Sequence, residues 1–276
     1  MEEALRRLES DLRSCGSLLV AFSGGADSAF LLAAAVRALG PSRVAAATAL
    51  SASLPAAELA GARAFAASLG VRLLTPTTDE LSRYGYVANT GDRCFFCKAE
   101  LLDVLVPLAA SLGLAHVATG TNADDALAGF RPGIRAAAER GARTPLLDAG
   151  LSKAQVRAAS RAWGLVTWDK PAAACLSSRV AFGVPVSRER LVRVELAEAA
   201  LRASLTAAGH QVRDLRVRDL GGGRARIEVD AWLVGVAAAH VDAVGAVEGF
   251  DEVEVDRRGF RSGSMNELLA EPARYR

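Results

Sequence analysis

The sequence of 276 residues lacks a Gly-Lys-Ser/Thr triplet, which excludes the ordinary lysine-tipped phosphate loop. No run approaches the ~20 strongly apolar residues of a membrane-spanning helix. The charged start, MEEALRRLES, lacks the apolar core of a signal peptide. Basic and acidic residues nearly balance, 33 against 31, which argues against a protein that mainly wraps nucleic acid. We therefore expect a soluble, cytoplasmic protein with no membrane partner and with nucleic acid disfavoured as a partner.

Cysteine and histidine are scarce, at four and three residues. In a reducing cytoplasm, cysteines are more often buried thiols, metal ligands or catalytic groups than disulfides. Cys94 and Cys97 are separated by two residues at the start of an expected helix, so their thiolates can meet one metal or cluster, or each other. None of the histidines has ligand-like spacing to this pair, so a four-ligand zinc site would need distant partners. We expect Cys15, which has no such neighbour, to be a packing residue.

Apolar runs alternate with helix-forming runs as far as residue 168. The pattern predicts strands at 18–22, 43–50, 71–75, 116–120 and 165–168, and helices at 29–39, 55–69, 98–112 and 153–163. Strands and helices that alternate at this spacing are typical of an α/β fold with a doubly wound parallel sheet.

The pattern changes after about residue 184. A long amphipathic helix over 186–209 is followed by a hairpin over 211–230, a helix over 231–243 and a further alternating segment at 251–260. This order predicts a smaller C-terminal α+β domain. We place the first domain at residues 1–184 and the second at residues 185–276.

The stretch SGGADS, residues 23–28, joins the first expected strand to the first expected helix. Helix N-terminal amides are unpaired and partly positive, and glycines let them approach an oxygen-rich ligand. Asp27 is the odd member, because a carboxylate beside phosphates needs a cation such as Mg²⁺. The alternative is a glycine-rich turn in which Asp27 caps the helix.

This string resembles the PP-loop of the N-type ATP pyrophosphatases, which split ATP between the α and β phosphates and transfer AMP to an acceptor. The resemblance implies an adenine nucleotide alpha hydrolase-like fold for the first domain. It also implies that ATP and Mg²⁺ are bound by Ser23, Gly24, Gly25, Asp27 and Ser28. The string alone does not identify the acceptor.

Cys175 follows the last expected strand, in KPAAACLSSRVAFG. Ligands of open parallel sheets bind beyond the carboxyl ends of the strands. We therefore expect SGGADS, Cys94, Cys97 and Cys175 to face one crevice. Three thiolates without a fourth ligand suit an iron–sulfur cluster with one open iron. Three unrelated buried thiols are the alternative.

Five motifs in order resemble the LarE family across most of the chain: SGGADS, DRCFFCK, TGTNADD, RPGIRAAAERGARTPLLDAGLSK and KPAAACLSSRVAFG. The C-terminal LRVRDLGGGRARIEV is similar to that family's second domain. LarE proteins are ATP-dependent sulfur transferases of nickel-pincer nucleotide synthesis, and their substrate is a pyridinium biscarboxylic acid mononucleotide. The resemblance implies this activity here, together with a homo-oligomeric assembly.

The resemblance also implies one of two sulfur sources. In one version of the family, three cysteines hold a four-iron–four-sulfur (4Fe-4S) cluster whose open iron binds an extra sulfide. In the other, a single cysteine, matched here by Cys175, gives up its own sulfur and ends as dehydroalanine. Because Cys94 and Cys97 accompany Cys175, the sequence favours the cluster, with self-sacrifice as the fallback.

The motif TGTNADD follows the fourth expected strand. Gly120, Thr121 and Asn122 are placed to contact nucleotide or substrate, and Asp124 or Asp125 to hold Mg²⁺. For any single residue, an Asx-turn that caps the next segment is the alternative.

Several basic residues are candidate phosphate ligands, with a solvated surface charge or a cross-strand ion cluster as the alternative. They are Lys98 beside the cysteine pair, Arg179 four residues after Cys175, and Arg216 and Arg218 on one face of a hairpin strand, opposite Arg226 and Glu228. The family's second domain contributes arginines to substrate phosphate binding, which favours Arg216 and Arg218. Glu198 is a weak metal candidate, on one helix face with Glu195.

Three other functions compete with sulfur transfer to the mononucleotide. A PP-loop enzyme that thiolates tRNA would need a basic surface or an RNA-binding domain, and the near-neutral charge disfavours it. An amidotransferase of the same superfamily would leave the three later cysteines without a role. A non-enzymatic nucleotide sensor would release no pyrophosphate.

Overall fold

The computed structural model describes residues 1–127, 132–171 and 174–269. The chain divides into two compact units, each with its own core. The first holds residues 1–80 and 94–171, and the second holds residues 81–93 and 174–269. The expected division at residue 184 assigns 81–93 and 174–184 to the first domain instead, and that functional division stays a prediction.

A four-stranded parallel sheet forms the centre of the first unit, in the order β3-β2-β1-β4. In register, Val20 of β1 stands between Ala46 of β2 and Ala118 of β4. All four residues of β1, LLVA, are buried, as expected for a central parallel strand covered on both faces. The strands are β1 (Leu18–Ala21), β2 (Val44–Ala47), β3 (Arg72–Leu74) and β4 (His116–Thr119).

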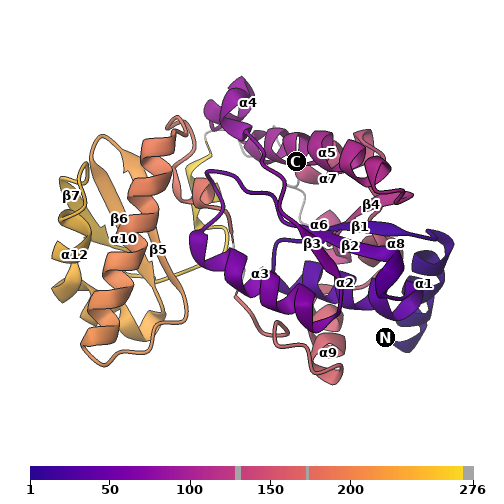
Figure 1. The fold of residues 1–276 in the computed structure, drawn as a ribbon. Helices are drawn as coiled ribbons and strands as arrows, with labels where there is room; N and C mark the ends of the chain where they lie inside the picture. The colour runs from indigo at the N-terminus through magenta and orange to yellow at the C-terminus, as the bar shows by residue number, and fades with distance from the viewer. Residues whose placement is uncertain (128–131, 172–173, 270–276) are drawn as a thin grey trace. The chain divides into compact units, whose positions relative to one another are not determined.

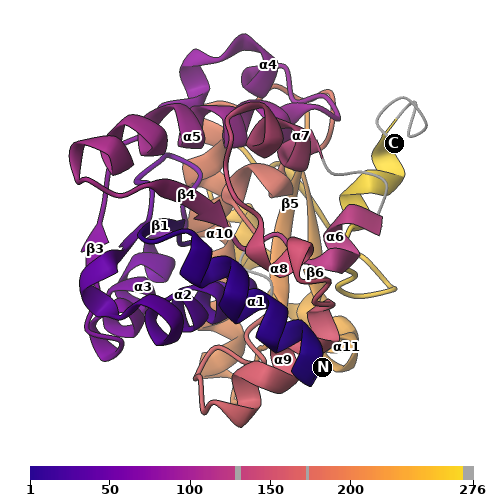
Figure 2. The same ribbon diagram turned by 90° about the vertical axis from the view of Figure 1, so that its right-hand side faces the viewer.

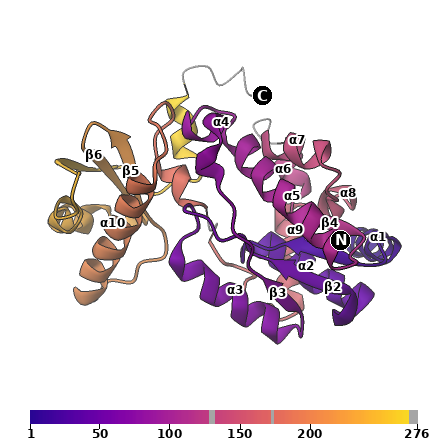
Figure 3. The same ribbon diagram turned by 45° about the horizontal axis from the view of Figure 1, so that its top comes forward.

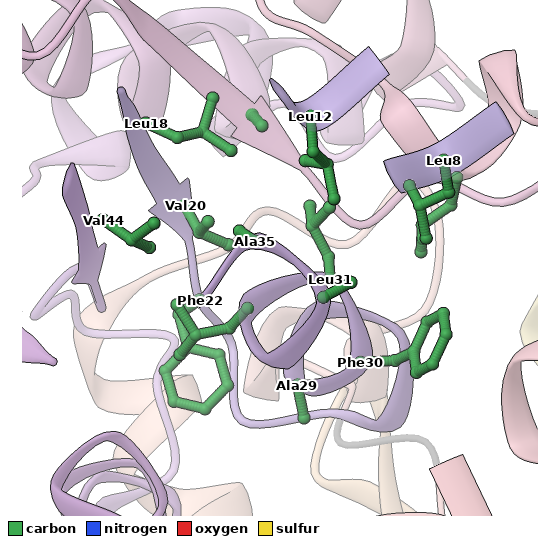
Figure 4. Close-up of a cluster of buried hydrophobic side chains, with 14 of the residues drawn as sticks. Leu8, Leu12, Leu18, Val20, Phe22, Ala29, Phe30, Leu31, Ala35 and Val44 are labelled. Carbon is green, nitrogen blue, oxygen red and sulfur yellow. The ribbon is translucent and has the colours of Figure 1, made fainter. Parts of the chain in front are cut away.

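Helices cover both faces of this sheet, which confirms the predicted doubly wound α/β fold (Figures 1 and 2). On one face, Leu18 and Val20 pack with side chains of α1, α2 and α9, among them Leu31 (Figure 4). On the other face, Leu19 packs with Leu102 of α5 and with side chains of α7. Side chains alternate along a strand, so one short strand supplies both core layers. The helices of this part of the chain are α1 (Glu2–Ser14), α2 (Ala26–Leu39), α3 (Ala56–Ser68), α5 (Arg93–Ser111), α6 (Ala123–Leu127), α7 (Pro132–Glu139), α8 (Pro145–Asp148) and α9 (Lys153–Ala162).

The predicted fifth strand is wrong, because residues 165–168 form turns. The position beside β4 is taken by Arg143, whose amide donates to Val117 O (2.8 Å) and whose carbonyl accepts from the Thr119 amide (3.0 Å). Val166, within the expected strand, is 83% exposed. A short apolar run does not by itself form a strand, since it needs a free edge to pair with.

The second unit is a small α+β domain. Strands β5 and β6 form the predicted antiparallel hairpin, and α10 packs against β5 (Figure 3). Strand β7 runs parallel to β6. The helix expected at 231–243 is interrupted and appears as short helical turns. The elements are α4 (Tyr84–Val87), α10 (Arg188–Ala207), β5 (Leu215–Gly221), β6 (Arg224–Val229), α11 (Val234–Ala237), α12 (Asp242–Gly245) and β7 (Glu252–Val255).

The two longest helices are α10, with 20 residues, and α5, with 19. Charged residues interrupt both sequences. Within the described part of the chain, none of the helices is long and apolar enough to cross a bilayer.

Candidate active site

The SGGADS loop connects β1 to α2, and contacts of its two serine hydroxyls hold its first and last residues together. Ser28 Oγ donates to Gly25 O (3.1 Å), accepts from the Ser23 amide (3.3 Å) and lies 3.1 Å from Ser23 Oγ. The Gly25 amide makes a long bond of 3.4 Å to Ser23 Oγ. Gly24 has φ of +72°, a conformation that other residues rarely adopt. Amides and hydroxyls therefore gather where the unpaired N–H groups of α2 begin, which is the donor set that an anion needs.

Asp27 lies in the first turn of α2 and forms an ion pair with Lys153 at the start of α9. It does not cap α2, because the N-cap residue is Gly25 and no side-chain cap bond is made. The second carboxylate oxygen of Asp27, Oδ1, is buried without a hydrogen-bond partner among the described residues. Such an oxygen is costly unless it binds something, and carboxylate oxygens are ligands that Mg²⁺ prefers. Asp27 therefore fits a magnesium ion.

Gly120, at the end of β4, allows a close approach between two backbones. A Cβ atom at this position would lie 2.8 Å from the Ser28 amide nitrogen and 2.9 Å from Ser28 Cα. Real Cβ atoms do not approach backbone so closely, so only glycine fits beside the start of α2 without a shift. Gly120 thus sets the position of the SGGADS loop through packing.

Gly120→Ala is expected to destabilise the protein by about 2–3 kcal/mol, because α2 must move away from the new methyl group. Chemical denaturation measures the loss. Gly61→Ala is the matched control: Gly61 lies in α3, a Cβ there meets nothing within 4 Å, and alanine should stabilise the helix by about 0.5–1 kcal/mol. Equal stability of Gly120→Ala and the wild type would contradict the packing argument.

Asn122 and Asp125 cap α6 reciprocally. The Asp125 amide donates to Asn122 Oδ1 (3.1 Å), and the Asn122 amide donates to Asp125 Oδ2 (3.2 Å). Thr121 Oγ1 lies 3.1 Å from Thr119 Oγ1. These contacts show the Asx-type cap, whereas nucleotide contact by Thr121, Asn122 and Asp125 stays a prediction.

Cys94 and Cys97 stand one turn apart near the start of α5, on one face of the helix. Burial lowers the pKa of the neighbouring Lys98 ammonium group, while the charges of Cys97, Cys94 and Asp125 act in the opposite direction. Gly133 of α7 packs over this turn, and a Cβ there would lie 3.6 Å from Cys94 O and 3.7 Å from Lys98 Cβ. The first unit thus brings the thiol pair, an ammonium group and a carboxylate together.

Cys175 belongs to the second unit and precedes a 3₁₀ turn over Leu176–Arg179. Its Sγ lies 3.0 Å from Ser177 Oγ, and its carbonyl accepts from Arg179 Nη1 (3.0 Å). Arg93, the residue directly before Cys94, donates to Ser177 O (2.9 Å). The backbone that carries Cys175 is therefore held by hydrogen bonds from two arginines.

The candidate phosphate ligands Arg179, Arg216 and Arg218 are buried in the second unit, at 4%, 8% and 5% exposure. Arg179 donates to both carboxylate oxygens of Glu198 (2.9 and 3.2 Å), and two nitrogens of Arg218 donate to the single oxygen Oε2 of Glu228 (3.0 and 2.5 Å). Burial, and after it the charge of Arg179, lowers the pKa of Arg216 to about 10. Buried guanidinium groups that gather in one domain are donors that suit a phosphate.

Glu198 and Arg226 have other partners than those considered from the sequence. Both oxygens of Glu198 bind Arg179, and Oε1 also accepts from the Val217 amide (3.1 Å), so Glu198 is occupied as a counter-ion. Arg226 pairs with Glu254 of β7 (2.6 Å). The hairpin face therefore carries ion pairs between neighbouring strands, and phosphate binding by Arg216 and Arg218 stays a prediction.

Sequence similarity to a known protein identifies the family, although no family model matches the chain. A pyridinium-3,5-bisthiocarboxylic acid mononucleotide synthase from Lactiplantibacillus plantarum is 34% identical over 265 residues, which cover 95% of this chain and 93% of that protein. The chain belongs to the LarE family. An uncharacterised protein from Synechocystis sp. is 39% identical over 274 residues, covering 98% of this chain and 99% of that protein.

Two residues of this LarE-family chain contact the loop although sequence reasoning assigns them no role. Lys153 pairs with Asp27, and Lys170 donates to Gly24 O (3.0 Å). Both stand within motifs that carry the LarE resemblance, 126 and 146 residues from their partners. The sequence signal that points to them is the rarity of lysine, because the chain has three lysines and 30 arginines.

The thiols divide between the two units: Cys94 and Cys97 belong to the first and Cys175 to the second. Among the described residues, no group of three or more His, Cys, Asp or Glu side chains is placed to hold a metal ion. Cys15 is buried in the core, 4% exposed, as expected for a packing residue. Three thiolates are a suitable donor set for an iron–sulfur cluster, but each unit alone supplies too few, so the three-cysteine site stays a prediction.

Proposed function

We propose that this LarE-family enzyme adenylates a carboxylate of pyridinium biscarboxylic acid mononucleotide and replaces a carboxylate oxygen by sulfur. The observation that carries the proposal is the 34% identity, over 95% of the chain, to a synthase of the bisthiocarboxylic acid mononucleotide. The SGGADS loop supports it, because it presents amide and hydroxyl donors at the start of a helix.

The ATP half-reaction follows from the chemistry of carboxylates. A carboxylate oxygen attacks the α phosphorus, the bond to the bridging oxygen breaks, and pyrophosphate leaves with both electrons of that bond. In this proposal the Gly25 amide and the hydroxyls of Ser23 and Ser28 hold the departing pyrophosphate. Asp27 would hold Mg²⁺, which neutralises phosphate charge as it builds up. Lys153 adds a fixed positive charge beside Asp27.

The sulfur half-reaction uses the acyl adenylate as the electrophile. In the self-sacrificing version, the Cys175 thiolate attacks the carbonyl carbon and AMP leaves, which produces a thioester. Removal of the Cα proton of Cys175 then breaks its Cβ–S bond and leaves a thiocarboxylate and dehydroalanine. We favour the other version, in which Cys94, Cys97 and Cys175 would hold a cluster that supplies the sulfur and Cys175 is retained. The buried Arg179, Arg216 and Arg218 would hold the substrate phosphate.

The test is incubation of the protein with Mg·ATP and the mononucleotide, followed by mass spectrometry of the product and the polypeptide. The proposal predicts pyrophosphate release and a thiocarboxylate product. An unchanged polypeptide identifies delivery through iron, whereas loss of one H₂S from Cys175 identifies self-sacrifice. Tight binding to bulk tRNA at moderate salt, without reaction of the mononucleotide, would favour tRNA thiolation. We also propose a cytoplasmic homo-oligomer, as the family resemblance implies.

A further inference from the structure

The three lysines of this chain all belong to the first unit, although arginine is the ordinary cation of the chain. Lys98 lies beside the cysteine pair, Lys153 pairs with Asp27, and Lys170 contacts Gly24; all belong to the first unit. Lysine carries a compact charge with three donors in a tetrahedral arrangement, whereas the guanidinium group is a broad planar fork. In a chain with 30 arginines, the use of lysine at the SGGADS loop directs attention to Lys153 and Lys170.

Lys170 reaches the SGGADS loop from outside. Its Nζ donates to Gly24 O (3.0 Å) and to Glu58 Oε2 (2.6 Å), and Glu58 lies in the first turn of α3. The two side chains are 29% and 21% exposed, so the ion pair is largely shielded from solvent. A Cβ on Gly24 would lie 3.7 Å from Nζ and 3.8 Å from Oε2. The ammonium group is therefore fitted between the loop backbone and α3.

The bond to Gly24 O controls the direction of the next amide. A trans peptide is planar, and its C=O and N–H bonds point in opposite directions. Because the Gly24 carbonyl points to Lys170, the Gly25 N–H must point away from it, and it faces Ser23 Oγ at 3.4 Å. That long bond is easily exchanged for a stronger one to a charged oxygen. The Gly25 amide thus faces the same side as the serine hydroxyls.

We propose that Lys170 is a positioning residue that turns the Gly24–Gly25 peptide so that its N–H donates to the pyrophosphate part of ATP. Glu58 pairs with the ammonium group and reduces its field at the anion, whereas the bond to Gly24 O fixes the direction of the peptide. The inference deepens the proposed function and rests on it for the identity of the anion. It assigns a role to the Lys170–Glu58 pair, which touches the nucleotide only through the loop.

Calorimetry with Mg·pyrophosphate and with AMP tests the role of Lys170. Lys170→Met should weaken Mg·pyrophosphate binding roughly tenfold, the effect of one charge-assisted hydrogen bond, and leave AMP binding unchanged. The matched control is Arg161→Met, which removes one positive charge from the exposed end of α9, where Arg161 stacks on Trp168; it should bind both ligands as the wild type does. Unchanged pyrophosphate binding in Lys170→Met, or equal weakening for both ligands, would overturn the inference.

Glu58→Gln provides a test with the opposite sign, which also applies if Lys170→Met does not fold. Removal of a negative charge near the anion should tighten Mg·pyrophosphate binding about two- to fivefold. Weaker binding would mean that the pair serves only to hold the fold, and would sink the positioning role.

Amide NMR of the ligand-free protein separates this inference from the proposed function. The Gly25 resonance should move in Lys170→Met and stay in place in Arg161→Met. If the wild type binds neither ATP nor pyrophosphate, the proposed function fails, and a shifted Gly25 resonance still supports control of the peptide by Lys170. An unmoved Gly25 resonance refutes that control whatever the ligand does.

Discussion

Asp27→Asn is expected to lower pyrophosphate release from ATP by about 10²–10³-fold. Asparagine keeps the size of the side chain and removes its charge, so both Lys153 and the proposed magnesium ion lose their carboxylate partner. The rate should be measured over a range of Mg²⁺ concentrations, because a lost ligand raises the concentration needed for half-maximal activity. Binding of AMP without metal should remain, since the change lies at the metal and pyrophosphate part of the site.

Asp103→Asn is the matched control for this prediction. Asp103 lies on α5, where its half-exposed carboxylate pairs with Arg140 (2.7 Å). Loss of such a surface pair changes stability by about 1 kcal/mol or less, and pyrophosphate release should stay within about twofold of the wild type. If Asp27→Asn released pyrophosphate at the wild-type rate at every Mg²⁺ concentration, the buried Oδ1 would hold no catalytic metal.

Cys175→Ser should abolish the thiocarboxylate product, with a loss of at least about 10³-fold, while pyrophosphate release continues. The hydroxyl is a far weaker nucleophile than a thiolate and a poor ligand for iron, so both versions of sulfur transfer fail. The ATP half-reaction survives because, in the proposal, it uses the SGGADS loop and not the Cys175 thiol. Separate assays of pyrophosphate and of thiolated product measure the two halves.

Substitution of the other cysteines separates the two sulfur sources. If a cluster delivers the sulfur, Cys94→Ser and Cys97→Ser abolish the product as completely as Cys175→Ser, and anaerobic reconstitution yields no cluster in any of the three. If Cys175 gives up its own sulfur, the first two variants retain activity. Cys15→Ala, in the core, is the control and should keep both activities. Thiocarboxylate formation by Cys175→Ser would refute both routes.

Much of the fold was predictable because its signals are local. The apolar run that becomes β1 and the glycines that follow it predict a buried strand and a turn wherever the rest of the chain lies. The same reasoning failed at residues 165–168, since a short apolar run becomes a strand only beside an open edge, and Arg143 already occupies that of β4. Whether an edge is open is a property of the whole sheet.

The candidate site divides in the same way. SGGADS and the cysteine pair were found from sequence because their members are adjacent in the chain. Lys153 and Lys170 were not, since each meets the loop only after α9 has packed against α2. The roles of Arg216 and Arg218 were open for a related reason: an arginine on a strand is a surface charge or a buried ligand depending on what covers that face.

The sequence by itself determined the class of fold, the turn that we propose binds nucleotide and the membership of a sulfur-transferring family, because each depends on contiguous or ordered motifs. Only the tertiary structure decided which distant charges serve that turn. Coulombic and hydrogen-bonding forces act over a few ångströms of space, and the chain brings Asp27 to Lys153 and Gly24 to Lys170 across more than 100 residues.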